Sequence, residues 1–475
     1  MHRAFARFVA LALLARPAFA LELPDLGESA RVGFSETREI NLGREIMRQI
    51  RGDRTFLDDA EINEYLNALG DRLVAASPEP TRRFEFFAVR DASINAFALP
   101  GGFIGVHTGL IAATRGESEL AGVLAHEIAH VSQNHIARIV DVHRNTALTS
   151  LAALAVAILA ARSNSQVAEA ALATAQAASL QTQLDFTREH EREADRVGLN
   201  ILRQAAFAPA GMASFFERLQ QAGRHHESQA PAYLRTHPLT FERIADMQNR
   251  IASLPYRQHE DSLEYLLVRA RVQALGEDPA QARARFAAAL AERPEAIDLR
   301  YGLALASLRA GRRAEATAAI APLVGQTRSA MIATLAAEVA LARQQPEEAL
   351  RIHRAALTRY GSDRPLALAH AHLLIDAGQP AAALAFIEEK RPFWPEDPAL
   401  QRAQARALLA LGRRAEGHLA EAEAQLLLDQ PARAMEQLQQ ARRAGDGDFF
   451  TLSRIDARMR ELRAAEARAA AARSR

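Results

Sequence analysis

Three residues in the first third of the chain have the types and spacing of a metal-dependent hydrolase. Residues 121–135 have the sequence AGVLAHEIAHVSQNH, which contains His126, Glu127 and His130. Positions i and i+4 of a helix project from one face, so both histidines can bind one metal ion while the glutamate faces the same pocket. Two neutral imidazoles suit zinc, and the carboxylate can take a proton from a zinc-bound water. The motif therefore predicts a zinc hydrolase with Glu127 as general base.

A zinc site of this kind needs a third protein ligand and one open position. One subclass places glycine three and histidine six residues after the second histidine, but here Gln133 and Ile136 stand at those positions after His130. That subclass is excluded. His135 is off the register of the other two histidines, and we interpret it as a surface residue or as a residue that supports a ligand.

A later acidic segment offers the third ligand. Residues 188–199 have the sequence REHEREADRVGL, in which Glu191 and Asp195 lie four positions apart. We expect Glu191 to ligate zinc and Asp195 to accept a hydrogen bond from the other ring nitrogen of a ligand histidine. Glu193 stays open as a competing ligand. The alternative without a metal is a salt-bridged acidic and basic helix face.

Helices and a small sheet must position these side chains. Residues 115–138 are predicted to form one long amphipathic helix, because apolar residues recur at helical spacing. Before it, residues 84–89 and 103–106 are rich in β-branched and aromatic side chains around a Pro-Gly-Gly turn, which predicts two or three antiparallel strands. Residues 146–183 are predicted to form an Ala-rich helical pair, which either packs on the core or forms a mobile, lid-like flap or a membrane-touching insertion.

The second half of the chain is almost entirely helical and repeats itself. Five segments align so that a small residue recurs at steps of 34, 33, 34 and 34 positions. This period is typical of tetratricopeptide repeats, whose paired helices approach closely at small residues. A sixth turn and second helix are predicted at residues 429–441. The recurring residues are Ala282, Ala316, Ala349, Ala383 and Gly417.

Composition excludes several classes of protein. The 475 residues suffice for two to four domains, and 58 Lys+Arg against 57 Asp+Glu leave no field that would attract nucleic acid or an anionic bilayer. Cysteine is absent, which excludes disulfide frameworks and thiolate nucleophiles. Any metal must therefore use histidine and carboxylate ligands.

The first 20 residues have the features of an export signal: a basic start, an apolar stretch and small residues before a cleavage site near Ala20. We expect the mature chain to begin at Leu21 and to lie in a cell envelope compartment, either soluble or peripheral to a membrane. The alternative is a short uncleaved anchor. The longest uncharged apolar run elsewhere, residues 147–161, is shorter than the ~20 residues of a spanning helix, so no transmembrane span is expected in the mature chain.

Together, the segments HEIAH, EREAD, INAFALPGG and THPLTFERI and the repeats resemble the M48 family of zinc metallopeptidases, in its periplasmic, repeat-containing branch. The resemblance implies a mainly α fold with a small β-sheet: a zincin (gluzincin-like) peptidase domain followed by an α-solenoid. The expected boundaries are 1–20 for the signal peptide, 21–258 for the peptidase domain, 262–450 for the repeats and 451–475 for a helical polar tail.

The resemblance also implies roles for individual residues. It makes His126, His130 and Glu191 the ligands of one Zn²⁺ ion per chain, Glu127 the general base and Asp195 the orienting carboxylate. It places residues 236–238, the sequence THP, and Arg243 near the metal.

Two roles compete for His237. It can ligate the open zinc position and hold the enzyme off, which is the state we favour, or it can stabilise the oxyanion. Residues 95–99 are expected to form an exposed strand beside the cleft, to which an extended substrate can add by backbone hydrogen bonds; the alternative is a purely structural edge. The substrate-binding residues would be Asn95, Ala96, Phe97 and Ala98.

The expected function is a zinc endopeptidase of the cell envelope that degrades unfolded or misassembled proteins. The resemblance points to outer-membrane protein assembly and quality control, with the repeats binding the assembly machinery. The alternative is a chaperone or adaptor of that machinery with latent proteolysis.

Overall fold

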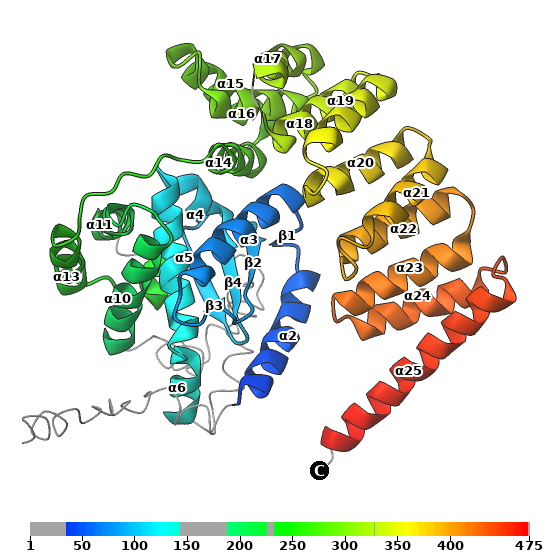
Figure 1. Cartoon of the computed structure of the whole chain (residues 1–475), viewed down its shortest axis with the longest axis horizontal. Coiled ribbons are helices and arrows are strands. Elements are labelled where there is room, and N and C mark those ends of the chain that lie inside the picture. The colour runs from blue at the N-terminus through cyan, green and yellow to red at the C-terminus, as the bar shows by residue number, and fades with distance from the viewer. Residues whose placement is uncertain (1–34, 143–187, 226–231, 327, 474–475) are drawn as a thin grey trace, which may run out of the picture.

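The computed structural model describes residues 35–142, 188–225, 232–326 and 328–473 (Figure 1). The predicted signal peptide and the Ala-rich helical pair lie outside the described residues. Within the described ranges, no helix has the length and apolar character that crossing a lipid bilayer requires.

A four-stranded mixed sheet forms the centre of the first region, with strand order β1-β2-β4-β3. β2 and β4 are parallel and the other pairs antiparallel, so the prediction of antiparallel strands was wrong for this central pair, and β1 was not predicted. The chain leaves β2, forms β3 at the edge and turns back through Gly101 and Gly102, both in the left-handed region with φ of 82° and 85°. This turn inserts β4 between β2 and β3. The strands are β1 (Phe56–Leu57), β2 (Glu85–Val89), β3 (Ala96–Leu99) and β4 (Phe103–His107).

Helices pack on this sheet, and the most buried of them is α5. Every residue of α5 is buried, because α3, α10, α11 and β3 surround it. The prediction of one amphipathic helix over residues 115–138 was therefore wrong: α5 ends at Ser132, and Asn134, with φ of 54°, separates it from α6. The helices are α2 (Glu36–Gly52), α3 (Ala60–Ala75), α4 (Thr108–Ala113), α5 (Glu117–Ser132), α6 (His135–Val142), α10 (Arg188–Gln204), α11 (Ala210–His225), α12 (Ala232–Thr236) and α13 (Phe241–Ala252).

Paired helices form the second region, as the repeat period predicts. The recurring alanines lie on the second helix of each pair and are fully buried. At Gly417 an added Cβ would lie 2.7 Å from Leu409 Cγ, so the helices meet too closely for a larger residue. The helices are α14 (Leu263–Gly276), α15 (Pro279–Glu292), α16 (Ile297–Arg309), α17 (Arg313–Gln326), α18 (Ala330–Ala342), α19 (Pro346–Arg359), α20 (Arg364–Asp376), α21 (Pro380–Lys390), α22 (Pro398–Ala410), α23 (Arg414–Leu427), α24 (Pro431–Arg443) and α25 (Phe449–Arg473).

The last helix is partly a structural element of the solenoid. Ile455 and Met459 of α25 are buried against Leu419 and Leu438 of the preceding helices. The rest of α25 extends beyond the repeats toward the C-terminus (Figure 1). The predicted polar tail is therefore helical, and its first half caps the array.

The two regions share one hydrophobic core. The repeats curve from α14 round to α24, so that later repeats lie beside α2, β1 and α3 (Figure 1). Tyr265 of α14 is fully buried, with its ring 6.5 Å from that of Tyr65 of α3. Glu117 of α5 accepts hydrogen bonds from Tyr65 and from Ser262, the N-cap residue of α14. The proposed division at residues 258–262 thus separates two sequence patterns that pack as one body.

Candidate metal centre

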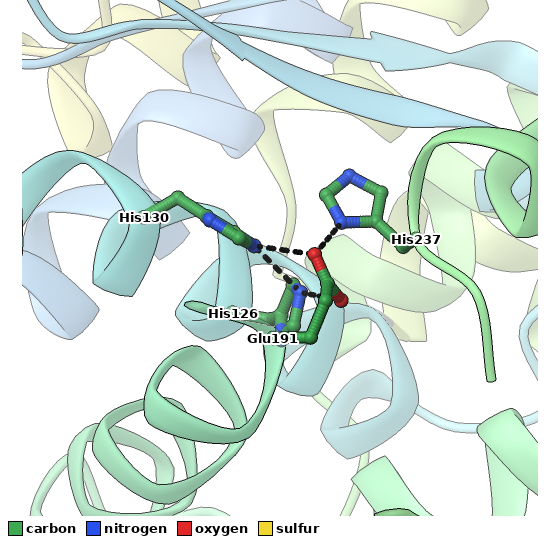
Figure 2. Close-up of side chains that lie close together, drawn as sticks. All are labelled: His126, His130, Glu191 and His237. Carbon is green, nitrogen blue, oxygen red and sulfur yellow. Dashed lines mark hydrogen bonds and ion pairs between the residues drawn. The ribbon is translucent and has the colours of Figure 1, made fainter. Parts of the chain in front are cut away.

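The residues of the candidate metal centre come from three places in the chain. α5 carries His126 and His130, α10 carries Glu191, and His237 directly follows α12 (Figure 2). α10 can approach α5 because it has a glycine at the contact: a Cβ on Gly198 would lie 3.1 Å from the backbone nitrogen of His126. The close packing of these two helices brings the acidic motif to the histidines.

One potential ligand atom from each of the four residues converges on one point, where all four atoms lie within 4.8 Å of one another. His130 Nε2 lies 3.0 Å from His126 Nε2 and 3.3 Å from Glu191 Oε1. His237 Nδ1 lies 2.9 Å from the same Glu191 oxygen. All four side chains are buried. Three imidazoles and one carboxylate that converge in a buried pocket fit a metal ion, and this donor set is one that zinc accepts.

A carboxylate and an arginine orient His126. Its Nδ1 lies 3.1 Å from Asp195 Oδ1, which leaves Nε2 directed at the cluster. Arg243 donates to both oxygens of Asp195, from Nε at 2.7 Å and Nη2 at 2.8 Å. Its Nη1 lies 2.7 Å from Glu191 Oε2 and donates to the carbonyl of Pro238. Arg243 thus connects α13, α10 and the THP segment beside the cluster.

The charged partners set the protonation of this cluster. Burial by itself would raise the pKa of Glu191, but His237, His126 and His130 hold it well below its usual range. Burial likewise opposes the ionisation of Asp195, but Arg243 and His126 lower its pKa below the usual value. Burial would lower the pKa of His126, but hydrogen bonding to Asp195 and Glu191 raises it to about 9. Both carboxylates are therefore ionised at neutral pH, as cation binding requires.

Glu127 lies beside the cluster without pointing a ligand atom into it. It is fully buried, and its Oε1 lies 3.6 Å from His237 Nε2. Burial raises its pKa, against the opposing effects of His237 and His126. Within the part of the chain that the structure describes, neither of its oxygens makes a hydrogen bond of normal geometry. A buried carboxylate with open acceptor positions is suited to take a proton from a reactant.

Glu193, the competing ligand, lies away from the convergence point. Its Oε2 lies 3.2 Å from His135 Nε2 and 2.8 Å from Arg138 Nη1. His135 is fully buried, and its Nδ1 lies 2.8 Å from Nδ1 of His130. Of the two interpretations of His135, the structure thus favours the one in which it supports a ligand.

β3, which follows Asn95, lies at the edge of the sheet and contacts α5. Among the described residues, no strand pairs with its outer edge. The side chains of Asn95, Ala96 and Phe97 are buried, and Phe97 packs edge-on against Phe87. The expectation of an exposed strand over residues 95–99 was therefore wrong for its side chains: Leu99 is buried as well, and only Ala98 is partly exposed. Recognition by this strand would use its backbone.

Tyr233 is a site residue that the sequence analysis missed. It is fully buried, and its ring stacks on that of His237 with centroids 4.7 Å apart. Burial raises the pKa of its phenol well above the usual value. The available signal was its position four residues before His237, which places both on one face of a helix.

Comparison with known proteins places this geometry in a family. Residues 60–251 match the model of peptidase family M48, and residues 275–339 match a tetratricopeptide repeat model. The beta-barrel assembly-enhancing protease of Escherichia coli (strain K12) is 34% identical over 379 residues, which cover 77% of this chain and 76% of that protein. The protein of the same name from Yersinia pestis is 30% identical over 445 residues, which cover 93% and 91%.

A third relative, from Vibrio cholerae, is 40% identical over 254 residues. That alignment covers 54% of this chain and 52% of the relative, so the chain matches about half the length of that protein. The prediction of a metallopeptidase followed by tetratricopeptide repeats is confirmed. The chain belongs to peptidase family M48.

Proposed function

We propose that this protein is a zinc endopeptidase that degrades unfolded or misassembled envelope proteins during outer-membrane protein assembly. The observation that carries the proposal is the buried convergence of His126, His130 and Glu191 next to the open carboxylate of Glu127. The names of the relatives, which are beta-barrel assembly-enhancing proteases, support the substrate class.

Each residue of the site has a proposed task in peptide hydrolysis. His126, His130 and Glu191 hold zinc, which when bound would polarise a peptide carbonyl and acidify a water molecule. Glu127 accepts the proton of the attacking water and delivers it to the leaving amine. Asp195 and Arg243 keep His126 and Glu191 in place, since Arg243 contacts both carboxylates.

We further propose that His237 occupies or guards the fourth position in the resting state. Its Nδ1 contacts Glu191 and its Nε2 faces Glu127, so the ring fills the space between the ligand and the base. The imidazole is almost fully buried under Tyr233. For a substrate to reach Glu127, His237 must move away.

The outer edge of β3 is the proposed docking site of the substrate. An extended polypeptide can pair with a free strand edge through backbone hydrogen bonds, and this mode selects unfolded chains. The Ala98 amide lies close enough to lower the pKa of Glu127, which brings that edge next to the base.

The proposed location is the periplasm, with residues 1–20 as a cleaved signal peptide and zinc as the single metal. The proposed partner of the repeats is the outer-membrane assembly machinery, because stacked tetratricopeptide helices present extended surfaces for proteins. A second candidate function, a chaperone or adaptor with latent proteolysis, is favoured by the burial of all four cluster residues.

Degradation of an unfolded outer-membrane protein by the purified mature chain tests the proposal. The wild type should contain about one zinc per chain and cut the substrate, and chelation should stop cleavage. Glu127→Gln should lose at least about 100-fold in rate while it keeps zinc, because the residue moves protons. Glu189→Gln, an exposed carboxylate on α10, is the matched control. Unchanged cleavage by Glu127→Gln would exclude the mechanism, and binding without cleavage by a zinc-loaded wild type would favour the chaperone function.

A further inference from the structure

The two ligand histidines of α5 are held by different kinds of partner. His126 Nδ1 lies 3.1 Å from a carboxylate oxygen of Asp195. His130 Nδ1 instead lies 2.8 Å from a ring nitrogen, Nδ1 of His135. The support of His130 must therefore continue beyond His135, because an imidazole alone does not fix which nitrogen carries the hydrogen.

The chain of contacts ends at an ion pair. His135 Nε2 lies 3.2 Å from Glu193 Oε2, and Arg138 Nη1 donates to the same oxygen at 2.8 Å. The ring of His135 is also held in place by His190, which stacks on it with centroids 4.4 Å apart. His135 is fully buried, whereas the side chains of Glu193 and Arg138 are 28% and 25% exposed. The contacts thus run from the buried ligand to the surface.

The donors and acceptors along this chain have one consistent order. An ionised carboxylate only accepts, so His135 must donate to Glu193 from Nε2. The neutral His135 ring then presents a lone pair at Nδ1, and His130 must donate from its own Nδ1. This leaves the lone pair of His130 on Nε2, the nitrogen that faces Glu191 and His126.

The helix break at Asn134 makes the contact between His130 and His135 possible. In a continuous helix, a residue five positions after His130 would lie about 140° round the axis and face elsewhere. Asn134 has φ of 54°, which ends α5 at Ser132 and lets α6 begin anew at His135. Arg82 holds the break, since it donates to Val131 O at 3.0 Å and to Asn134 Oδ1 at 3.2 Å.

We propose that His135 and Glu193 are positioning residues that fix the tautomer and ring orientation of His130 for metal binding. The three acids of the EREAD motif then have separate tasks: Glu191 is a ligand, Asp195 orients His126 directly, and Glu193 orients His130 through His135. The inference rests on the proposed function only in that the cluster binds a metal.

Zinc affinity of the full mature chain, measured by competition with a chelating dye, tests the relay. Loss of an outer partner of a ligand histidine typically costs 10–100-fold in metal affinity. His135→Ala and Glu193→Ala should each weaken zinc binding by about that factor. Glu193→Gln should change it much less, because the amide oxygen still accepts from His135 Nε2. Glu189→Ala, an exposed acid on the same helix, should leave it unchanged.

A second measurement separates positioning from general destabilisation. In metal-free protein labelled with ¹⁵N-histidine, His130 should carry its hydrogen on Nδ1, and Glu193→Ala should produce a mixture of tautomers with an unchanged melting temperature. If His135→Ala does not fold, the variants of Glu193, whose side chain is only partly buried, decide the question. Wild-type zinc affinity in Glu193→Ala, or hydrogen on Nε2 of His130 in the wild type, would overturn the proposal. Absence of zinc binding by the wild type would contradict the proposed function instead, and the tautomer measurement would still test the relay.

Discussion

The molecule contains two clusters of acids and bases in which the pKa values of acids are shifted in opposite directions. At the metal centre, Glu191 and Asp195 have pKa values below their usual range. At the junction between the peptidase region and the repeats, burial raises the pKa of Glu61 to about 8. Both clusters contain an arginine that contacts two carboxylates, so the arginine alone does not explain the difference.

The junction has fewer cationic groups for its acids. Arg271 of α14 contacts Asp59, the N-cap residue of α3, at 2.9 Å and Glu61 at 3.0 Å. Glu338 is also close enough to raise the pKa of Glu61. One guanidinium therefore faces three carboxylates, and the desolvation of Glu61 exceeds its attraction to Arg271.

The metal centre surrounds its acids with more donors. Arg243 and three imidazoles contact Glu191 and Asp195, and their combined hydrogen bonds and charges exceed the cost of burial. The comparison shows that burial alone does not decide ionisation. A cluster meant to receive a cation keeps its carboxylates charged, whereas a cluster that only joins two regions can hold a protonated acid.

Removing a ligand should have the largest effect. The binding free energy of a structural zinc ion is roughly 10–16 kcal/mol shared by four ligands, so Glu191→Gln should weaken zinc binding by roughly 10²–10³-fold. Glu193→Gln should keep most of the affinity, because Glu193 lies outside the convergence point. Zinc content after dialysis against a chelator measures both. Equal loss from the two variants would leave the ligand assignment unsupported.

Removing the arginine at the junction should have a smaller energetic effect than removing a zinc ligand. Arg271→Met removes the cation that Asp59 and the buried Glu61 contact and should lower the free energy of unfolding by about 3 kcal/mol. The double variant Arg271→Met/Glu61→Gln should lose about as much stability as Arg271→Met alone near neutral pH, because Glu61, with its pKa raised to about 8, is already largely protonated. Urea unfolding at constant pH checks both variants. Recovery of stability in the double variant would instead show that Glu61 is ionised beside Arg271.

The pH dependence of stability separates the clusters further. The folded-state pKa of Glu61 is raised from 4.5 to about 8, so the folded chain holds this proton more tightly than the unfolded chain. The stabilisation that this proton contributes to the free energy of unfolding is therefore complete below about pH 4.5, and it is lost as the pH rises toward 8. At up to 1.36 kcal/mol per pH unit, the loss between pH 5 and 7 is at most about 2.7 kcal/mol.

Glu61→Gln should flatten this part of the pH profile, which urea unfolding at pH 5, 6 and 7 would measure. Glu191 and Asp195 have lowered pKa values, so their stabilisation is present at neutral pH and lost only in acid. A Glu61→Gln profile with the same slope as the wild type between pH 5 and 7 in metal-free protein would contradict the contrast between the clusters.

His237→Ala should have the smallest effect on zinc binding. The variant should keep zinc through His126, His130 and Glu191 and should cleave unfolded substrate a few-fold faster, because the ring no longer stands between Glu191 and Glu127. Initial rates at saturating substrate measure this. Loss of activity with zinc retained would instead assign His237 to oxyanion stabilisation.

Local spacing determined the features that depend on a single helix. His126, Glu127 and His130 could be placed on one face because the helical period fixes the direction of neighbouring side chains. The same holds for Glu191 and Asp195. The small residues of the repeats were found through their period, and they are buried where paired helices meet.

Features that depend on the meeting of distant segments needed the tertiary structure. The parallel pairing of β2 and β4 depends on the insertion of β4 between two strands, which no local pattern encodes. The break at Asn134 was hidden because apolar residues continue on both sides of it, and asparagine is compatible with a helix as well as with a left-handed turn.

The sequence by itself determined that this chain is a metallopeptidase with repeats, since its motifs and period are local. Only the tertiary structure decided what each acid contacts. Glu193 and Asp195 are two positions apart on one helix, yet one lies against His135 and the other against His126. Arg271 pairs with Asp59 across more than 200 residues of chain. Such pairings follow from the packing of α10 on α5 and of α14 on α3, because a side chain's partner is set by the surface its helix meets.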